Sequence, residues 1–180
     1  MTEKGIWPAM PPAAERAPAP EQSFWPDREK LPSADALRQR RVKLHMLCGR
    51  TAQEVIFAEP GYSAVARKGY AWEGWGLPVY HSRAGNEEVR IELTVPKGAK
   101  GKVRVFVADP DNFGGGRKQK MSIAGDTLGL VEKLGEGRWI EKAVGAEKTR
   151  DGQVLVEALN ARPGANAVIS IVEWVDEGER

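Results

Sequence analysis

The sequence predicts an all-β protein: an antiparallel jelly-roll β-sandwich preceded by a Pro-rich, extended N-terminal arm. Short alternating or apolar runs recur from residue 50 onward, with turn residues between them and no helical period. Regular spacing of short strands is typical of two packed antiparallel sheets. The predicted strands are Glu54–Ala58, Glu88–Val95, Lys102–Ala108, Gln119–Ala124, Thr127–Leu130, Trp139–Val144, Gln153–Leu159 and Ala167–Val175.

The N-terminal arm, residues 1–33, holds most of the prolines of the chain. Proline lacks a backbone N–H and fixes φ, so this stretch should run extended rather than join a sheet or a helix. Trp7 and the Phe24-Trp25-Pro26 cluster stand out, because large aromatic side chains are costly to leave in water. We therefore expect the arm to dock on the surface of the domain, on a neighbouring subunit in a homo-oligomer, or on a parent protein.

The segment from Ser33 to Leu47 has two interpretations. Ser33 can cap a short helix that Gly49 would stop, whereas the alternation of Val42, Leu44 and Met46 with basic residues indicates a strand. We expect a helix or irregular structure in the first half and a strand in the second. The predicted organisation is an arm and linker over residues 1–49, the sandwich over 50–176 and a polar tail over 177–180.

One strand–loop–strand run, Lys102–Lys120, indicates the fold class most directly. Val103, Val105 and Val107 fall on one face of its first strand, and Lys102, Arg104 and Phe106 fall on the other. This is the period-2 pattern of a strand with one buried face. A loop with carboxylates, an amide and three glycines follows, and loops are where β proteins hold most of their binding sites.

Composition excludes several classes of function. The formal net charge of +2 is too balanced for a protein that neutralises a phosphate backbone, so no nucleic acid partner is expected. Cys48 is the single cysteine and His45 and His81 are the two histidines, which leaves no disulfide framework and no Cys or His zinc site. No run approaches the roughly 20 apolar residues that span a bilayer, and the N-terminus lacks the series of a secretory signal. We expect no membrane partner, and either an intracellular protein or a segment of a longer secreted chain.

The order of features from residue 50 to 176 resembles the galactose-binding-domain-like superfamily, whose jelly rolls include malectin-like modules and carbohydrate-binding modules of bacterial glycoside hydrolases. The resemblance implies a capacity to bind carbohydrate, frequent structural calcium and an extracellular or cell-surface setting, whereas the Pro-rich arm has no counterpart in the common pattern. It is carried by Val55–Ala58, Gly69–Gly74, Glu88–Val95, Val103–Ala108, Arg117–Ile123, Gly137–Glu141, Asp151–Val156 and Asn166–Trp174.

An aromatic segment, residues 70–83, is the first candidate site. Aromatic faces stack on the apolar C–H faces of pyranose rings while polar neighbours bind the hydroxyls. In the alternative interpretation, Tyr70 and Trp72 seal the open end of the sandwich and Trp75 packs beneath a loop. The candidate ligand-binding residues are Tyr70, Trp72, Glu73, Trp75, Tyr80, His81 and Arg83.

The acidic loop is the second candidate site. Asp109, Asp111 and Asn112 offer hard oxygen ligands of the kind that calcium prefers, although the EF-hand spacing is absent and distant ligands would be needed. The alternative is an Asx turn, in which Asp109 and Asn112 accept hydrogen bonds from nearby backbone N–H groups. Gly114–Gly116 lacks the spacing and the strand-to-helix context of a phosphate loop, so these glycines are expected to permit a tight reversal.

These observations predict a non-catalytic module that binds carbohydrate weakly, as an accessory to a glycosidase. The chain has no Ser/His/Asp or Cys/His grouping and no distinctive pair of carboxylates, so an enzyme is not expected. Trp139 and Trp174 lie within strand patterns and are expected in the core. The alternative function is a structural or assembly protein whose aromatic arm docks on neighbouring subunits.

Overall fold

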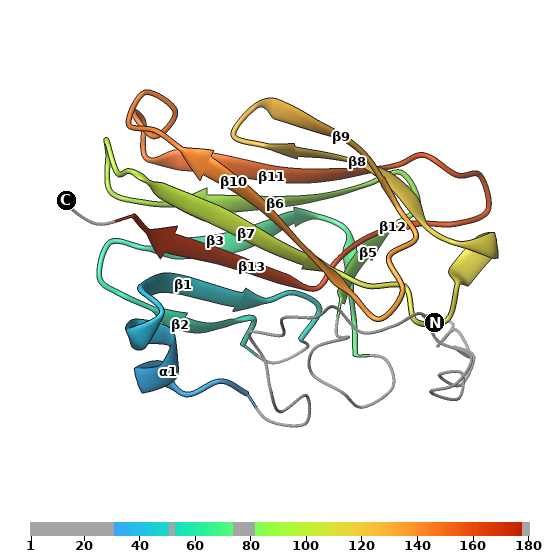
Figure 1. The fold of residues 1–180 in the computed structure, drawn as a ribbon, viewed down its shortest axis with the longest axis horizontal. Helices are drawn as coiled ribbons and strands as arrows, with labels where there is room; N and C mark the ends of the chain where they lie inside the picture. The colour runs from blue at the N-terminus through green and yellow to red at the C-terminus, as the bar shows by residue number, and fades with distance from the viewer. Residues whose placement is uncertain (1–30, 51–52, 74–81, 178–180) are drawn as a thin grey trace.

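The computed structural model describes residues 31–50, 53–73 and 82–177, and it forms a β-sandwich (Figure 1). Two five-stranded antiparallel sheets stack on each other. Sheet A has the order β10-β7-β13-β1-β2, sheet B has the order β3-β6-β11-β8-β9, and three further strands, β12-β5-β4, form a small sheet.

The elements are α1 Ala34–Gln39, β1 Val42–Leu47, β2 Val55–Ala58, β3 Ser63–Lys68, β4 Tyr70–Trp72, β5 Ser82–Gly85, β6 Glu88–Thr94, β7 Gly101–Val107, the 3-10 turn η4 Phe113–Gly115, β8 Lys118–Ile123, β9 Asp126–Glu132, β10 Arg138–Val144, β11 Gln153–Asn160, β12 Ala167–Ile169 and β13 Ile171–Asp176.

Each of the eight predicted strands coincides with a strand of the sandwich, which confirms the all-β prediction. The last predicted strand is divided at Ser170 into β12 and β13, which belong to different sheets. Three strands, β3, β4 and β5, were not predicted. Among helices of the described residues, none has the length and apolarity needed to cross a membrane.

The segment that joins the arm to the sandwich is a helix followed by a strand, as expected for its two halves. The Oγ of Ser33 accepts a hydrogen bond from the N–H of Ala36 at 3.2 Å and caps α1. Arg41, with φ of 62°, breaks the helix before β1 begins. β1 pairs with both β13 and β2, so sheet A includes residues that precede position 50.

The core lies between the two sheets and consists of the inward-facing residues of both. Val103, Val105 and Val107 of β7 all lie in it, as the alternation predicts, and Trp174 of β13 is fully buried there. Cys48 is buried as expected, and burial raises the pKa of its thiol to about 12, which keeps it protonated and unreactive.

The outer face of sheet A is buried as well, which the alternation did not predict. β7 was expected to bury one face, but Arg104 and Phe106, on its other face, are also buried. The strand register aligns Phe57, His45, Glu173, Arg104 and Glu141 in one row across β2, β1, β13, β7 and β10. Glu173 lies at the centre of this row, and its carboxylate binds Nδ1 of His45 at 2.7 Å and Nη1 of Arg104 at 2.9 Å.

A second, apolar row lies beside the ionic one. It aligns Leu47, Ile171, Phe106 and Trp139, and the rings of Phe106 and Trp139 are tilted against each other with centroids 5.2 Å apart. Trp139 therefore packs on the outer face of the sheet rather than between the sheets. Gly137, with φ of 138°, lies directly beneath Phe106, and a Cβ at this position would overlap the ring.

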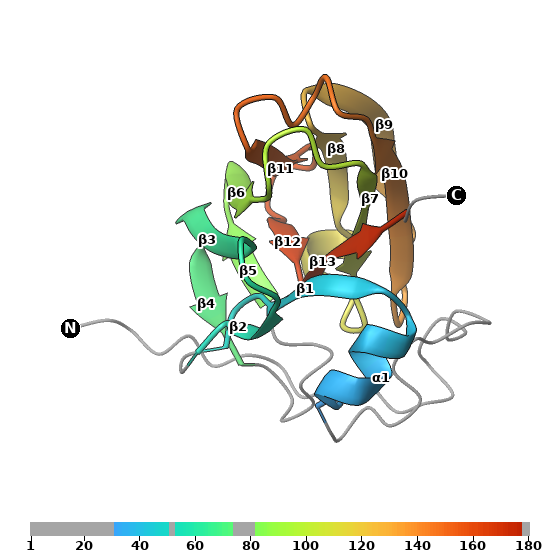
Figure 2. The ribbon, with the colours of Figure 1, turned by 90° about the vertical axis from the view of Figure 1, so that its left-hand side faces the viewer.

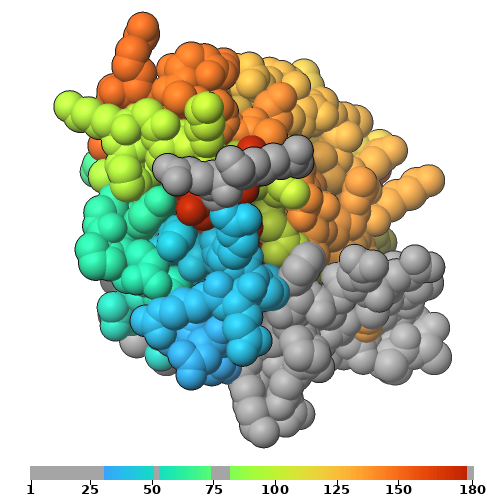
Figure 3. Space-filling model, turned by 60° about the vertical axis from the view of Figure 1, so that its left-hand side comes forward, coloured from blue at the N-terminus to red at the C-terminus, as the bar shows by residue number. Residues whose placement is uncertain are grey.

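Helix α1 covers one edge of this outer face. Leu37 packs with Val42 and Phe57 in a small cluster that Val175 borders, over β1 and β2. Figure 2 shows α1 outside sheet A, next to β1 and away from sheet B. In the space-filling view of Figure 3, α1 forms a blue projection on the surface.

Candidate functional site

The two sequence-predicted sites meet at one end of the sandwich, which we call the loop end. It contains β4, the loop from Ala108 to Arg117 that follows β7, the turn 133–137 before β10 and the turn 161–166 after β11 (Figure 1, right). Loops from distant parts of the sequence lie together here because sheet A is antiparallel, so that β7 ends where β10 and β13 begin.

A buried guanidinium organises the loop end. Nη1 of Arg117 binds Oδ1 of Asp109, and it binds Oδ1 of Asp111 at 3.0 Å. Its backbone N–H donates to Oδ2 of Asp109 at 2.7 Å, and the N–H of Phe113 donates to Oδ1 of the same carboxylate at 3.0 Å. The phenyl ring of Phe113 lies 4.9 Å from Cζ of Arg117. The acidic loop is therefore fixed to its own arginine.

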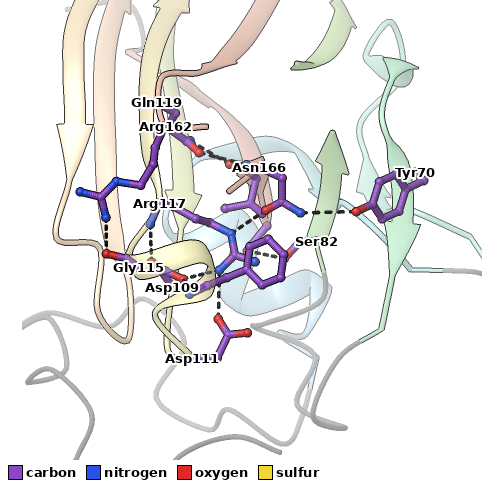
Figure 4. A network of polar contacts seen from close by, with 12 residues as sticks. Tyr70, Ser82, Asp109, Asp111, Gly115, Arg117, Gln119, Arg162 and Asn166 are labelled. Carbon is purple, nitrogen blue, oxygen red and sulfur yellow. Dashed lines mark hydrogen bonds and ion pairs between the residues drawn. The ribbon is translucent and has the colours of Figure 1, made fainter. Parts of the chain in front are cut away.

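The network continues from Arg117 to an exposed aromatic ring (Figure 4). Nε of Arg117 donates to Oδ1 of Asn166 at 2.8 Å, and Nδ2 of Asn166 donates to the hydroxyl of Tyr70 at 3.4 Å. Asn166 is buried, whereas Tyr70 is 44% exposed. The hydrogen bond from Asn166 thus links the Tyr70 hydroxyl on β4 to the arginine of the acidic loop.

The three glycines of the acidic loop permit a close approach between two loops. Gly114 has φ of 61°, and a Cβ there would overlap the backbone of Gly164 and Ala165. Nη1 of Arg162, from the same turn as Gly164, donates to the carbonyl of Gly115. The expectation of a tight reversal is met, and the glycines also let the turn after β11 pack on the loop.

A pocket of about 550 Å³ opens beside this contact. Its polar wall contains Lys118 and Glu132, whose Nζ and Oε2 lie 2.9 Å apart, together with Arg162 and Lys133. The hydrogen bond and the positive charge of Lys118 lower the pKa of Glu132, which keeps this carboxylate ionised. The pocket is thus lined by several hydrogen-bond donors and by two carboxylates, those of Asp109 and Glu132.

The residues predicted in the aromatic segment differ in their exposure to water and in their contacts. Tyr70 and Glu73 are exposed, whereas Trp72 is buried, with 9% of its area exposed. Nη2 of Arg83 binds Glu54, and its Nη1 donates to the carbonyl of Gly69 at 3.2 Å, so Arg83 holds the base of β4. Burial lowers the pKa of Arg83. Trp75, Tyr80 and His81 lie outside the described residues.

The carboxylates of the acidic loop bind groups of the protein itself. Asp109 forms the Asx-type hydrogen bonds of the alternative interpretation, and the charge of Arg117 occupies the position between the two carboxylates. Within residues 31–50, 53–73 and 82–177, no three His, Cys, Asp or Glu side chains gather as metal ligands would. Oδ2 of Asp111 is a buried oxygen without a hydrogen-bond partner, and burial raises the pKa of this carboxyl group. Calcium binding by Asp109, Asp111 and Asn112 stays a prediction.

Sequence reasoning missed the residues that join the two candidate sites. Arg117, Asn166 and Arg162 were assigned to neither candidate site. Arg117 and Asn166 are 49 positions apart, so no local spacing brings them together. The sequence did offer one signal, which was Arg117 at the end of the acidic loop. An arginine that follows two carboxylates in the same loop often pairs with them.

No family model matches this chain, and neither does any curated protein. Solved structures do match. The CBM36-1 domain of a multidomain xylanase from the hindgut metagenome of Trinervitermes trinervoides is 17% identical, with 66% of this chain and 99% of that domain covered and a TM-score of 0.43. The β-glucuronidase of Bacteroides uniformis is 11% identical, with 81% of this chain and 19% of the enzyme covered and a TM-score of 0.49.

A third match is the ANX1 ectodomain from Arabidopsis thaliana, which is 7% identical. It aligns with 76% of this chain and 49% of its own length, with a TM-score of 0.46. The matches thus include carbohydrate-binding modules, glycosidase domains and plant ectodomains. At these identities, what those proteins bind is a statement about them alone.

Proposed function

We propose that this chain is a non-catalytic β-sandwich module that binds carbohydrate weakly at the loop end, in the manner of an accessory domain of a glycosidase. The observation that carries the proposal is the position of Tyr70. Its ring is exposed while its hydroxyl is held by Asn166, which in turn binds the buried Arg117.

A fixed, exposed aromatic ring suits a sugar ligand. The apolar C–H face of a pyranose stacks on such a ring, and a ring that is already oriented loses little conformational entropy on binding. The network around Arg117 supplies this orientation from the protein interior. The orientation and exposure of the Tyr70 ring therefore support a role as a binding platform.

The pocket on the other side of the network provides the polar part of such a site. A volume of about 550 Å³ is within the usual range for small-molecule sites, and Lys118, Lys133 and Arg162 can donate hydrogen bonds to hydroxyl or carboxylate oxygens. A polysaccharide chain at the loop end could contact both the Tyr70 ring and this pocket.

The carboxylates of the loop end suit binding better than catalysis. A glycosidase needs one carboxylic acid with a raised pKa in reach of the substrate and one free carboxylate. Glu132 has a lowered pKa and is paired with Lys118, and Asp109 is bound on both oxygens. Asp111 has a raised pKa, but its side chain is buried against Arg117.

Titration of the full chain with plant, algal and bacterial polysaccharides tests the proposal. We expect binding by at least one class of glycan, and we expect Tyr70→Ala to weaken it at least about fivefold, since loss of an interface anchor costs more than about 1 kcal/mol. Tyr70→Phe should fall between the wild type and Tyr70→Ala, because the ring remains but the hydrogen bond from Asn166 that orients it is lost.

Leu155→Ala is the matched control, since it also removes an exposed large side chain but lies on the outer face of sheet B. Trp72→Ala is less informative, because its buried ring would cost stability as well. The proposal fails if no glycan in the panel binds, or if Tyr70→Ala and Leu155→Ala bind as the wild type does.

A further inference from the structure

The pocket at the loop end carries more positive charge than its carboxylates balance. Its wall contains four basic side chains and two carboxylates, which are Arg117, Lys118, Lys133 and Arg162 against Asp109 and Glu132. The formal net charge of the whole chain is only +2, so the surplus in this pocket is a local concentration of charge. A concave site lined by an excess of one charge attracts ligands of the opposite charge.

The topology of sheet B brings three of these cations together from distant parts of the sequence. β11, β8 and β9 are neighbours in that sheet. At the loop end, Arg162 follows β11, Lys118 is the first residue of β8, and Lys133 follows β9 directly. Because the three strands are antiparallel and adjacent, their ends deliver the three basic side chains to one place.

Lys133 and Arg162 form no ion pair within the part of the chain that the structure describes. Their charges act on the same carboxylate as that of Lys118, since all three lower the pKa of Glu132. Lys118 is the one that binds this carboxylate, with Nζ and Oε2 2.9 Å apart. The charges of the other two are therefore left for a ligand to balance.

The carboxylates of the pocket are already neutralised by the protein, so they would repel an anionic ligand little. Asp109 accepts hydrogen bonds from two backbone N–H groups, one on each oxygen, and is also paired with the guanidinium of Arg117. Glu132 is paired with Lys118. The charge that an entering group meets is therefore mainly that of the two unpaired cations.

Arg162 is held in a position that suits the binding of an anion. Its Nη1 donates to the carbonyl of Gly115, which fixes the guanidinium beside the pocket (Figure 4). An arginine has five N–H donors in one rigid plane, so further donors remain for two oxygens of a carboxylate or of a sulfate. Lys133 adds an ammonium group with three donors, from the turn after β9.

We propose that this pocket binds the anionic group of an acidic saccharide, a carboxylate of a uronic acid or a sulfate ester, through Lys133 and Arg162. The inference rests on the proposed function, because it takes the ligand of the loop end to be a saccharide, and it adds the class of sugar. Pro110 and Leu134 form an apolar part of the same wall, against which C–H groups of the sugar ring can lie.

Calorimetric titration with matched pairs of glycans tests the class of ligand. Polygalacturonate and its fully methyl-esterified form share one backbone, but only the first is charged. We expect at least about tenfold tighter binding of the anionic member at low salt, and a smaller difference as salt is raised. Dextran sulfate and dextran form the second pair, which separates sulfate from carboxylate. The experiment uses the full chain with its N-terminal arm, whose predicted docking lies outside the described residues.

Charge variants test the location. Lys133→Gln and Arg162→Gln should each weaken binding of the preferred anionic glycan about tenfold, because each removes a charged donor. Lys133 is exposed, so its variant should fold even if Arg162→Gln loosens the contact with Gly115. Lys97→Gln is the matched control, since it removes the same charge from an exposed side chain in the turn before β7, and the loop end lies beyond the other end of that strand.

The outcomes distinguish failure of this inference from failure of the proposed function. If both members of each pair bind equally, the loop end binds sugar but the inference of an acidic ligand is wrong. It is also wrong if Lys97→Gln weakens binding as much as the two pocket variants do. If the pocket variants lose the preference while Tyr70→Ala binds as the wild type does, the pocket is confirmed and the platform is not. If no glycan binds, both fail together.

Discussion

The outer faces of the two sheets are made of the same kind of alternating strand but differ in their contact with water. On sheet B, Leu155 and Leu159 keep 37% and 46% of their area exposed, and the ion pair of Arg90 with Glu157 lies at the surface. On sheet A, Phe106 and Glu173 in equivalent outward positions are buried. The alternation along a strand therefore shows which residues point to the outer face of a sheet. It does not show whether that face is exposed to water.

The ion pairs of the two faces therefore contribute different amounts to the stability of the fold. Sheet B carries exposed pairs such as Arg67–Glu92 and Lys118–Glu132, each 2.9 Å long, which side-chain entropy and salt weaken. Sheet A concentrates three basic partners, His45, Arg40 and Arg104, on the one carboxylate of Glu173. Removing that carboxylate would take away the partner that these three side chains share, although Arg104 would keep its ion pair with Glu141 at 2.6 Å.

The largest expected effect is therefore that of Glu173→Ala. We expect it to lower the free energy of unfolding by about 3 to 5 kcal/mol, because the buried Arg104 and the partly buried Arg40 would keep their charges and lose this carboxylate. Glu157→Ala on sheet B, which also removes a carboxylate facing an arginine, should cost about 1 kcal/mol or less. Urea denaturation measures both, and equal losses would show that the two faces do not differ.

A pH titration sharpens the same comparison. Burial alone would raise the pKa of Glu173, but the hydrogen bond from His45 and the positive charges of His45, Arg40 and Arg104 outweigh burial and lower it. A lowered folded-state pKa means that the carboxylate stabilises the protein above its unfolded pKa of about 4.3 and that this contribution disappears as the pH falls through the folded value.

The stability difference between the wild type and Glu173→Gln should thus shrink steadily as the pH falls below about 5. Denaturation curves of both proteins across the acid range test this. A difference that stays constant down to the folded-state pKa would contradict the role given to the ionised carboxylate.

The smallest expected effect is the difference in stability loss when one methyl group is removed from an apolar residue of each face. Ile171→Val removes one methyl group from a buried position and should cost about 0.5 to 1.5 kcal/mol. Leu155→Val removes one from an exposed position and should change stability by less than about 0.5 kcal/mol. If both shifts are equally small in thermal unfolding, the outer face of sheet A is not packed as an interior.

The sequence predicted most of the strands because a period of two is a local property. It missed β3, whose Ser63–Lys68 run has only small apolar residues, and β5, Ser82–Gly85, which has no apolar alternation at all. These strands form because β6 and β12 offer them paired edges. Their existence depends on tertiary contacts that a local pattern does not encode.

The candidate site was predictable in its parts but not in its arrangement. The aromatic segment and the acidic loop each stood out by composition, yet 39 positions separate Tyr70 from Asp109 in the sequence. Asn166 connects them from a third loop, through hydrogen bonds to Tyr70 and Arg117. The same limit applies to Arg104, whose alternation with valines suggests an exposed side chain until the row across sheet A is known.

The glycine beneath Phe106 has a practical consequence for experiments on this protein. The turn that ends at Gly137 also contributes Leu134 and Gly135 to the wall of the pocket, so an insertion or tag there would disturb the loop end and also displace the ring. The turn around Gly98 is at the opposite end of the molecule, and a Cβ at this glycine would contact nothing (Figure 1). A surface-immobilisation handle inserted beside Gly98 would leave both the loop end and the outer face of sheet A free to be measured.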